Sequence, residues 1–368
     1  MPDSMTEVPT LRWGILGTGW ISTMFVTDVI APRINAPVRH VVAALGSSSE
    51  EKGAMFVQKV WAYSSAPRPR IYDRYQNVYN DENVDIVYVG TPHAVHKQNC
   101  LDAITAGKSV LCEKPFAINE HEARDVIHAA RDKGVFIMEA VWTRFFPLMR
   151  SLHEHLNVKK SIGQVHRLFV DFGLDIPLAG LPASSRLKDP GQGAGALLDI
   201  GIYSLTYASL VMGKGKLGKS HPHPQVISML DIVDGIDESN VVILRYEEQR
   251  STAICTSTLG FKSPEDFARI EGSEGTITIF GGAASCPSGF RLCRTNADPK
   301  QSATQTFSFN HPAGTTGFFY EADAVAVDIA NGRLENETMP LDETLRMLRL
   351  MDTIRKDGGL VYFQDQDR

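Results

Sequence analysis

The sequence has few cysteines and no long apolar segment. Only five of its 368 residues are cysteines, and none of them forms a C-x-x-C pair. Such scattered cysteines predict neither a disulfide framework nor a zinc site, so we expect reduced thiols in a cytoplasmic protein. No apolar run approaches the ~20 residues that cross a bilayer, and no secretory signal is recognisable at the N-terminus. We therefore expect no membrane partner.

The sequence also has no excess of basic residues. It contains 37 lysines and arginines against 43 aspartates and glutamates, which gives a formal net charge of −6. This balance argues against a nucleic-acid partner, because binding to phosphates needs a basic surface. Hydrophobic residues make up 43% of the chain, which is enough for a sizeable core. At ~150 residues per domain, the length predicts two domains.

The first part of the chain alternates short apolar runs with helix-like stretches. The apolar runs are residues 11–16, 40–45, 84–89, 109–112 and 135–139. The helix-like stretches are residues 21–30, 50–60, 93–105 and 120–131. Buried strands that alternate with helices predict a parallel sheet with right-handed crossover connections. We therefore expect an α/β domain of the Rossmann type, with a doubly wound parallel sheet, over residues 8–146.

From about residue 147 the pattern changes to strands that follow one another with few helices between them. The strand-like runs are residues 165–172, 226–233, 241–246, 252–259, 267–271 and 275–280. Helices are expected over residues 194–212, 320–331 and 342–356, and a surface loop over residues 214–224. This order predicts an α+β domain over residues 147–368 with a large, mostly antiparallel sheet.

A glycine-rich turn follows the first expected strand and opens the first expected helix. Gly17 and Gly19 stand where a dinucleotide-binding fold needs a tight turn and close approach of the backbone to a pyrophosphate. The third small position of the usual motif is Ser22, which still permits close packing of helix and strand. The free N–H groups of the helix then favour phosphate binding. The candidate cofactor-binding residues of this turn are Gly17, Thr18, Gly19, Trp20 and Ile21.

The end of the second expected strand indicates which dinucleotide is preferred. An NAD site usually has an acidic residue there, whereas this chain has three serines followed, after two glutamates, by a lysine. Hydroxyl groups and an ammonium group suit a 2′-phosphate, so the pattern favours NADP over NAD, provided that the two glutamates point away. The candidates are Ser47, Ser48, Ser49 and Lys52. The alternative is a solvated loop with no ligand role.

Two further strand ends carry polar motifs. Thr91-Pro92-His93 follows the third expected strand, with His96 close behind, and Glu113-Lys114-Pro115 closes the fourth. Ligands of an open α/β sheet bind beyond the carboxyl ends of its strands. A lysine at that edge can contact both a cofactor and a substrate.

Four motifs together resemble the glucose–fructose oxidoreductase/inositol dehydrogenase/MocA family. They are Gly17-Thr18-Gly19, Thr91-Pro92-His93, Glu113-Lys114-Pro115 and residues 195–203. Residues 138–147 are similar to the branch that contains dimeric dihydrodiol dehydrogenase and the fungal NADP-dependent D-xylose 1-dehydrogenases. The resemblance runs from residue 11 to about residue 363 and leaves residues 214–224 unmatched. It implies a metal-free enzyme that forms a homodimer through the open sheet of its second domain.

The resemblance also implies catalytic roles for Lys114, Asp199 and Tyr203. Tyr203 would be the general acid/base, and a nearby ammonium group of Lys114 would lower its pKa by favouring the phenolate. Asp199 would either bind a substrate hydroxyl group or orient Lys114. Asp199 and Tyr203 are four residues apart in an expected helix, which places them on one face.

Several other residues are candidates around this chemistry. Glu113, Thr91, Pro92, His93 and His96 would line the cofactor or substrate pocket, although His96 is equally well explained by a packing role. Trp142 would stack on a sugar face or on the nicotinamide region. Arg144 would bind either the cofactor or a structural carboxylate. Phe172 and Arg186 are further candidate substrate residues.

These inferences predict an NADP-dependent oxidoreductase. The expected reaction is oxidation of an aldose such as D-xylose at C1 to the lactone, or of an allied trans-dihydrodiol. The alternatives are an oxidoreductase on a specialised metabolite, a non-catalytic NADP-binding regulator, and cofactor-assisted glycoside cleavage. The presence of Lys114, Asp199 and Tyr203 argues against the regulator, and the tyrosine and tryptophan motifs argue against glycoside cleavage.

Overall fold

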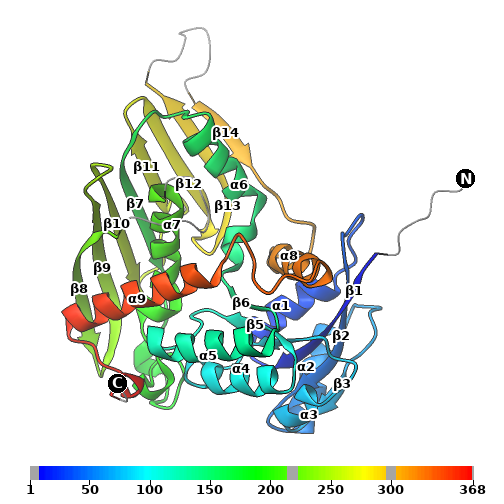
Figure 1. Ribbon diagram of the computed structural model, residues 1–368. Helices are drawn as coiled ribbons and strands as arrows, with labels where there is room; N and C mark the ends of the chain where they lie inside the picture. Colours follow the sequence, from blue (N-terminus) through cyan, green and yellow to red (C-terminus); the bar gives the residue numbers. More distant parts are fainter. Residues whose placement is uncertain (1–7, 214–222, 296–303, 367–368) are drawn as a thin grey trace, which may run out of the picture. The chain divides into compact units, whose positions relative to one another are not determined.

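The computed structural model describes residues 8–213, 223–295 and 304–366, which form two compact units (Figure 1). Within the described residues, the first unit comprises Met1–Phe116, Arg124–Trp142 and His311–Asn336. The second comprises Ala117–Ala123, Thr143–Asn310 and Glu337–Arg368. The units thus differ from the expected contiguous segments 8–146 and 147–368, because the chain passes between them several times. Most of the expected loop over residues 214–224 lies outside the described residues.

The first unit contains a six-stranded parallel sheet with the strand order β3-β2-β1-β4-β5-β6. Its strands are β1 (Thr10–Leu16), β2 (Arg39–Gly46), β3 (Arg70–Tyr72), β4 (Ile86–Val89), β5 (Ser109–Glu113) and β6 (Ile137–Ala140). Its helices are α1 (Trp20–Ile30), α2 (Glu50–Val60), α3 (Tyr75–Tyr79), α4 (His96–Thr105), most of α5 (Glu120–Lys133) and α8 (Phe318–Ala330). The expected doubly wound α/β sheet is confirmed. Strand β3 and helix α3 were not expected, because three and five residues are too short to show a hydrophobic period.

Helix α8 belongs to the first unit although it comes near the end of the chain. Its N-terminus is capped by the buried carboxylate of Asp28 in α1, which accepts hydrogen bonds from the backbone N–H groups of Thr316 (2.9 Å), Gly317 (2.7 Å) and Phe318 (2.8 Å). Burial raises the pKa of Asp28, and these bonds oppose that effect. A short pair between Arg33 and Asp323 (2.6 Å) fixes the middle of the helix. These contacts explain why residues 311–336 cluster with the dinucleotide-type sheet.

The second unit contains an eight-stranded sheet with the order β14-β13-β12-β11-β7-β10-β9-β8. Its strands are β7 (Val165–Gly173), β8 (Gln225–Val233), β9 (Ile236–Tyr246), β10 (Ser251–Thr258), β11 (Ala268–Gly272), β12 (Gly275–Ala283), β13 (Cys286–Arg294) and β14 (Thr304–Ser308). Only the β7–β10 pair is parallel, so the expectation of a mostly antiparallel sheet is confirmed. Its helices include α6 (Pro147–His153), α7 (Ile202–Met212) and α9 (Leu341–Gly358).

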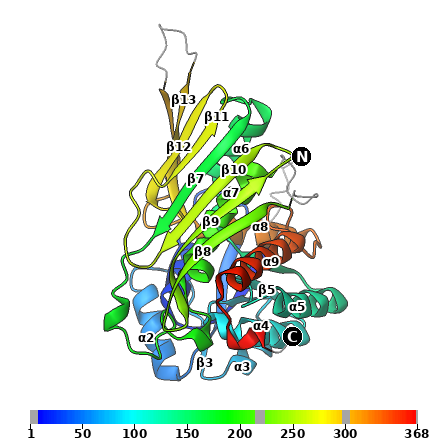
Figure 2. The ribbon, with the colours of Figure 1, turned by 90° about the vertical axis from the view of Figure 1, so that its left-hand side faces the viewer.

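One face of this sheet is buried beneath helices and the other is not covered by them (Figure 2). Helix α7 contacts β7 and β10, and α9 contacts β8. Side chains of strand β10 alternate strictly between buried and half-buried, as a sheet with one covered face requires. The helical stretch Pro190–Met212 is long and apolar enough to cross a membrane. However, 89% of its most apolar segment of 18 residues is buried inside the protein, as in a core helix.

Candidate active site

The glycine turn between β1 and α1 has the geometry of a phosphate cradle. Gly17 has a φ of +90°, and a Cβ there would lie only 3.0 Å from the carbonyl oxygen of Gly90. A Cβ on Gly19 would meet no heavy atom within 4 Å among the described residues, so the backbone is open at the start of α1. No side chain in the described chain caps this helix, and its first turn has no acidic residue. The N-terminus of α1 therefore suits a pyrophosphate.

The other residues of this turn differ in exposure. Thr18 and Ile21 are half-buried, whereas Trp20 is exposed. Ser22 is fully buried and its hydroxyl group packs directly against Gly90, where a Cβ would collide with it. Ser22 thus permits the close packing of helix and strand that the third glycine of the usual motif provides.

The serines after β2 form a polar cluster that fits a phosphate ester. The hydroxyl group of Ser47 is buried and has no hydrogen-bond partner in the described part of the chain. The ammonium group of Lys52 donates to Ser48 Oγ at 3.0 Å. Ser49 has a different task, because its hydroxyl group accepts from the backbone N–H of Lys52 (3.2 Å) and caps α2. An unpaired hydroxyl group and a cation are thus left for a ligand.

His96 connects two strand ends instead of facing a pocket. The ring is fully buried, with Nδ1 at 2.9 Å from Pro115 O and Nε2 at 2.8 Å from Thr91 O. Burial lowers its pKa. These contacts correspond to the packing alternative, and contact of His96 with the cofactor or substrate stays a prediction. His93 lies edge-to-face against it at 5.7 Å, in the short turn η1 (His93–Val95) that Pro92 precedes.

Hydrogen bonds hold the end of strand β5, at Glu113 and Lys114, in place. Glu113 accepts hydrogen bonds from Tyr88 Oη (2.6 Å) and from the backbone N–H of Lys114 (3.2 Å). Glu321 of α8 is fully buried, with neither oxygen partnered among the described residues, and burial raises its pKa together with the charge of Glu113. Sequence reasoning missed Glu321, because only the return of α8 to this unit brings it here.

Trp142 and Arg144 follow β6 but have separate partners. The Trp142 ring stacks on Phe318 with centroids 3.9 Å apart and planes 2° apart, within the first unit. In the second unit, Arg144 forms an ion pair with Glu343 (3.0 Å) and donates to Thr338 O (3.0 Å). Although burial opposes it, Arg144 holds the pKa of Glu343 well below its usual range. Arg144 thus binds a buried carboxylate, as one of its two expected roles requires, and its contact with the cofactor stays a prediction.

Tyr203 lies in the first turn of α7 and Asp199 in the segment just before that helix, both in the second unit. The ring of Tyr203 is buried and packs edge-on against Phe172 with centroids 5.6 Å apart. Arg186 Nη1 lies 3.8 Å from Asp199 Oδ1. All four residues predicted around this chemistry belong to the second unit. There Phe172 contacts the ring of Tyr203, and Arg186 pairs with Asp199. Lys114 belongs to the first unit.

The helix that carries Asp199 differs from the expected α-helix. Residues Leu197–Gly201 form a π-turn (η6), and α7 begins only at Ile202. A π-turn has more residues per turn, so the four-residue spacing of Asp199 and Tyr203 does not have its α-helical meaning. Such turns are frequent at functional sites, and the sequence carried no signal for this one.

The π-turn is anchored by a residue that sequence reasoning missed. Asp237 of β9 is buried and accepts hydrogen bonds from the backbone N–H of Leu197 (2.8 Å) and from Asn240 (2.9 Å). Burial raises the pKa of Asp237 to about 7. Asp237 lies at the start of β9, which directly follows a two-residue turn, and only the tertiary fold brings it to the start of η6.

The fold and these groups define a class of protein. A parallel sheet with an open glycine turn is typical of proteins that bind a dinucleotide. The second unit places a tyrosine, an aspartate and an arginine side chain at or near the start of one helix. In the described residues, no cluster of three histidine, cysteine, aspartate or glutamate side chains is arranged to hold a metal. This combination is that of a two-domain oxidoreductase that uses a nicotinamide dinucleotide.

Comparisons with known proteins identify the family. A model described as "Oxidoreductase family, NAD-binding Rossmann fold" matches residues 11–141, and one described as "GFO/IDH/MocA C-terminal domain" matches residues 153–278. The chain belongs to the GFO/IDH/MocA oxidoreductase family. It is 33% identical to D-xylose 1-dehydrogenase (NADP(+)) of Hypocrea jecorina, over 96% of this chain and 93% of that protein. It is 35% identical to trans-1,2-dihydrobenzene-1,2-diol dehydrogenase of Danio rerio, over 96% of this chain and 99% of that protein.

Solved structures show the same fold at lower identity. A 3-ketoreductase from Actinomadura kijaniata, in complex with NADP and TDP-benzene, has a TM-score of 0.75 at 21% identity and covers 95% of this chain and 97% of its own. A levoglucosan dehydrogenase, in complex with NADH and levoglucosan, has a TM-score of 0.79 at 18% identity with the same coverage. The expected family and fold class are thus confirmed.

The raised pKa of Asp237 makes stability depend on pH. The folded chain keeps the proton up to about pH 7, whereas an unfolded aspartate loses it near pH 4. The Asp237 contribution to stability therefore falls as the pH rises between these values. Asp237→Asn removes this titration, so its free energy of unfolding relative to wild type should rise by a few kcal/mol from pH 4.5 to 7.5, at about 1.4 kcal/mol per pKa unit.

Urea denaturation at a series of pH values measures this difference. Asp231→Asn, at an exposed position of the neighbouring strand β8, is the matched control and should show no such trend. Parallel pH profiles for wild type and Asp237→Asn would contradict the assigned pKa.

Proposed function

We propose that this protein is an NADP-dependent oxidoreductase that oxidises an aldose such as D-xylose at C1 to the lactone, or an allied trans-dihydrodiol. The observation that carries the proposal is the pairing of Tyr203 with Phe172 and of Asp199 with Arg186 at one helix start. It occurs in a chain that is 33–35% identical, over nearly its whole length, to dehydrogenases named for a sugar and for a cyclic diol. Both substrates offer a ring carbinol with neighbouring hydroxyl groups, so one polar pocket serves either.

Three side chains would carry the chemistry. A nicotinamide dinucleotide held by the glycine turn before α1 and by the serines after β2 would supply the acceptor for a hydride from the carbinol carbon. Tyr203 takes the proton of the hydroxyl group on that same carbon, which leaves a carbonyl group. Lys114 favours the phenolate form of Tyr203, and Asp199, kept close to the guanidinium group of Arg186, binds a substrate hydroxyl group.

The groups after β2 support NADP as the cofactor. The unpaired hydroxyl group of Ser47 and the ammonium group of Lys52 provide a donor and a positive charge for a 2′-phosphate. The name of the Hypocrea jecorina relative specifies NADP(+). We also propose a cytoplasmic location, where the five free cysteines would remain thiols.

The uncovered face of the second sheet supports a homodimer. Ile227 and Met229 of β8 are 66% and 76% exposed, and their strand partners Ile243 and Val241 lie on the same face. The apolar row continues through Ile254 on β10. An exposed apolar row of this kind is normally covered, and a second copy of the chain offers the same strands in the same register.

Removing the phenol group of Tyr203 tests the proposed reaction. Tyr203→Phe keeps the ring against Phe172 but loses the proton acceptor, so kcat for NADP reduction with D-xylose or a trans-dihydrodiol should fall by about 100-fold or more. The Kd for NADP should stay unchanged. Tyr207→Phe, which removes another buried hydroxyl group of α7, is the control. Full activity of Tyr203→Phe would exclude Tyr203 as the acid/base, and a wild type inactive on both substrates would favour the specialised-metabolite or regulatory alternatives.

Reversing the charge of Lys52 tests the cofactor site. Lys52→Asp places a negative charge beside Ser48, so the Kd for NADP should rise by about tenfold, whereas the Kd for NAD should change less than about twofold. Lys59→Asp makes the same charge change in the last turn of the same helix and should leave both constants unchanged. Calorimetric titration with both dinucleotides makes the comparison. Equal weakening of both would place the 2′-phosphate elsewhere.

A charge on the uncovered sheet face tests the homodimer. Wild type should sediment at twice the mass of the chain, and Met229→Arg should sediment as a monomer, because each copy would bury a charge in an apolar interface. Met55→Arg, at an exposed position of α2, is the control and should remain dimeric. A wild type that sediments as a monomer at micromolar concentration would remove the proposed interface.

A further inference from the structure

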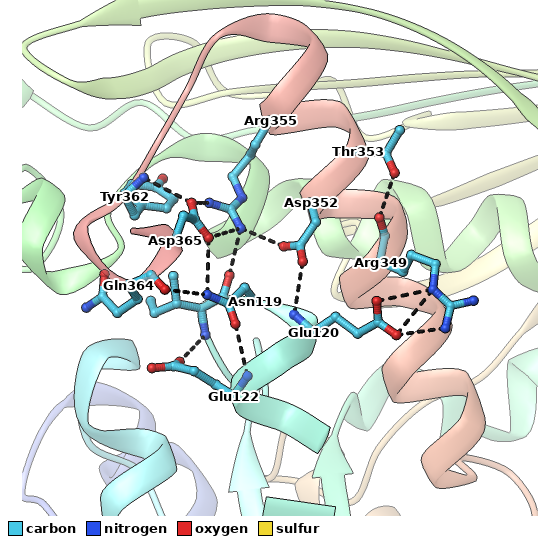
Figure 3. A network of polar contacts seen from close by, with 11 residues as sticks. Asn119, Glu120, Glu122, Arg349, Asp352, Thr353, Arg355, Tyr362, Gln364 and Asp365 are labelled. Atoms are coloured by element: carbon cyan, nitrogen blue, oxygen red, sulfur yellow. Dashed lines mark hydrogen bonds and ion pairs between the residues drawn. The ribbon is translucent and has the colours of Figure 1, made fainter. Parts of the chain in front are cut away.

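The end of the described chain folds back onto α9 and forms a polar cluster within the second unit (Figure 3). We call this cluster the C-terminal clamp; it consists of Asn119, Arg355, Tyr362 and Asp365. We propose that the C-terminal clamp positions the catalytic groups, because it fixes one chain segment next to Lys114 and another next to Asp199. The proposal rests on the proposed function for the identity of these groups. The residues of the C-terminal clamp act through other residues and are therefore positioning residues.

The first arm of the clamp holds the segment that follows Lys114. Arg355 Nη2 donates to the carbonyl oxygen of Ile118 at 3.1 Å, and Asn119 Nδ2 donates to Asp365 Oδ1 at 3.1 Å. Ile118 comes only four residues after Lys114, so the backbone that leaves the strand end has little freedom. A displacement of this segment would therefore be transmitted along the chain to Lys114.

The second arm holds the segment that leads to Asp199. The hydroxyl group of Tyr362 donates to the carbonyl oxygen of Ala194 at 2.5 Å. The next residue, Gly195, has a φ of +133°, and a Cβ there would lie 3.0 Å from Tyr362 Oη and would collide with the carboxylate of Asp237. Asp199 follows five residues after Ala194, inside the π-turn. Tyr362 thus fixes the start of the segment that presents Asp199.

Both arms meet at one buried cation. The guanidinium group of Arg355 is 2% exposed and pairs with Asp365 (2.5 Å) and Asp352 (2.6 Å), and it lies 4.9 Å from the centre of the Tyr362 ring. Although burial opposes it, Arg355 holds the pKa of Asp365 below its usual range. A buried cation held by two carboxylates tolerates little change of geometry, so both arms share one rigid centre.

Glutamine and glutamate side chains extend the clamp along the same two segments. Gln364 Nε2 donates to the carbonyl oxygen of Gly191 at 3.3 Å, near the second arm. The backbone N–H of Glu120 donates to Asp352 Oδ2 at 3.1 Å, and Arg349 pairs with the Glu120 carboxylate at 2.7 Å, near the first. The bonds to Ile118, Asn119 and Glu120 thus lead to the first segment, and those to Gly191 and Ala194 lead to the second.

Tyr362→Phe tests the second arm with the smallest possible change. The variant keeps the ring beneath Arg355 and loses only the bond to Ala194. Tyr207→Phe is the matched control, because it loses an equally buried hydroxyl bond to a backbone carbonyl, that of Ala284 at 2.9 Å. Hydrogen exchange of the peptide over residues 194–203 and steady-state kinetics with D-xylose and NADP are measured for both. Asn119→Ser tests the first arm in the same way, through the peptide over residues 117–123.

We expect Tyr362→Phe to lower kcat by about tenfold with KM for NADP unchanged, because misplacement of a catalytic group costs rate and not cofactor binding. Exchange over residues 194–203 should accelerate in Tyr362→Phe and not in Tyr207→Phe. Equal kinetics and equal exchange in the two variants would overturn the proposal, as would a kcat loss of the same size in both. If wild type oxidises none of the proposed substrates, the proposed function fails, and the exchange comparison alone decides whether the clamp holds the segment.

Discussion

The parallel alignment of six strands is the constraint on which the dinucleotide-type unit depends. Parallel strands have all their carboxyl ends at one edge of the sheet, so the residues that follow each strand gather there whatever their distance in sequence. The glycine turn, the serine cluster, the Thr91 turn and Lys114 each follow directly after such an end. Hydrogen bonds of the backbone thus assemble this part of the site, and the side chains only complete it.

The elements of this unit could be predicted because their signals are local. Strands buried on both faces read as apolar runs, and a tight turn beside a phosphate requires glycine, as the φ of Gly17 shows. Even the departure from the usual motif at Ser22 could be understood in advance, because only its size matters to the packing against Gly90. The same reasoning identified the serines after β2, although not that Ser49 is engaged in capping α2.

The parts that could not be predicted depend on contacts between distant residues. Arg144 pairs with Glu343, 199 residues further along the chain, and no local pattern distinguishes such a partner from a cofactor phosphate. The same holds for His96, whose two carbonyl partners become visible only in the fold. The π-turn before α7 has an ordinary apolar sequence. Its geometry is fixed by Asp237, which lies 40 residues away from Leu197.

Buried charged groups connect distant segments of this chain, and we call these connections joints. They suit this role because their interactions depend strongly on geometry. Apolar packing is non-directional and tolerates small slips, whereas a buried ion pair loses much of its energy when its geometry changes. Asp28 joins α8 to α1, Glu343 joins α9 to the segment after β6, and Arg355 joins α9 to two further segments. Each joint binds a part of the chain that the order of strands alone would leave unattached.

This division of labour separates the residues of the frame from those around Tyr203 and Asp199. The strand ends fix the glycine turn and the serine cluster within the first unit, and Asp237 fixes the start of η6 within the second. Residues such as Phe172 and Arg186 extend from this fixed frame, and Arg186 is the more exposed partner in its pair with Asp199. Changes at such positions alter the surroundings of Tyr203 and Asp199 without disturbing a joint. Relatives named for a sugar and for a cyclic diol are 33% and 35% identical to this chain, so proteins named for different substrates share this family frame.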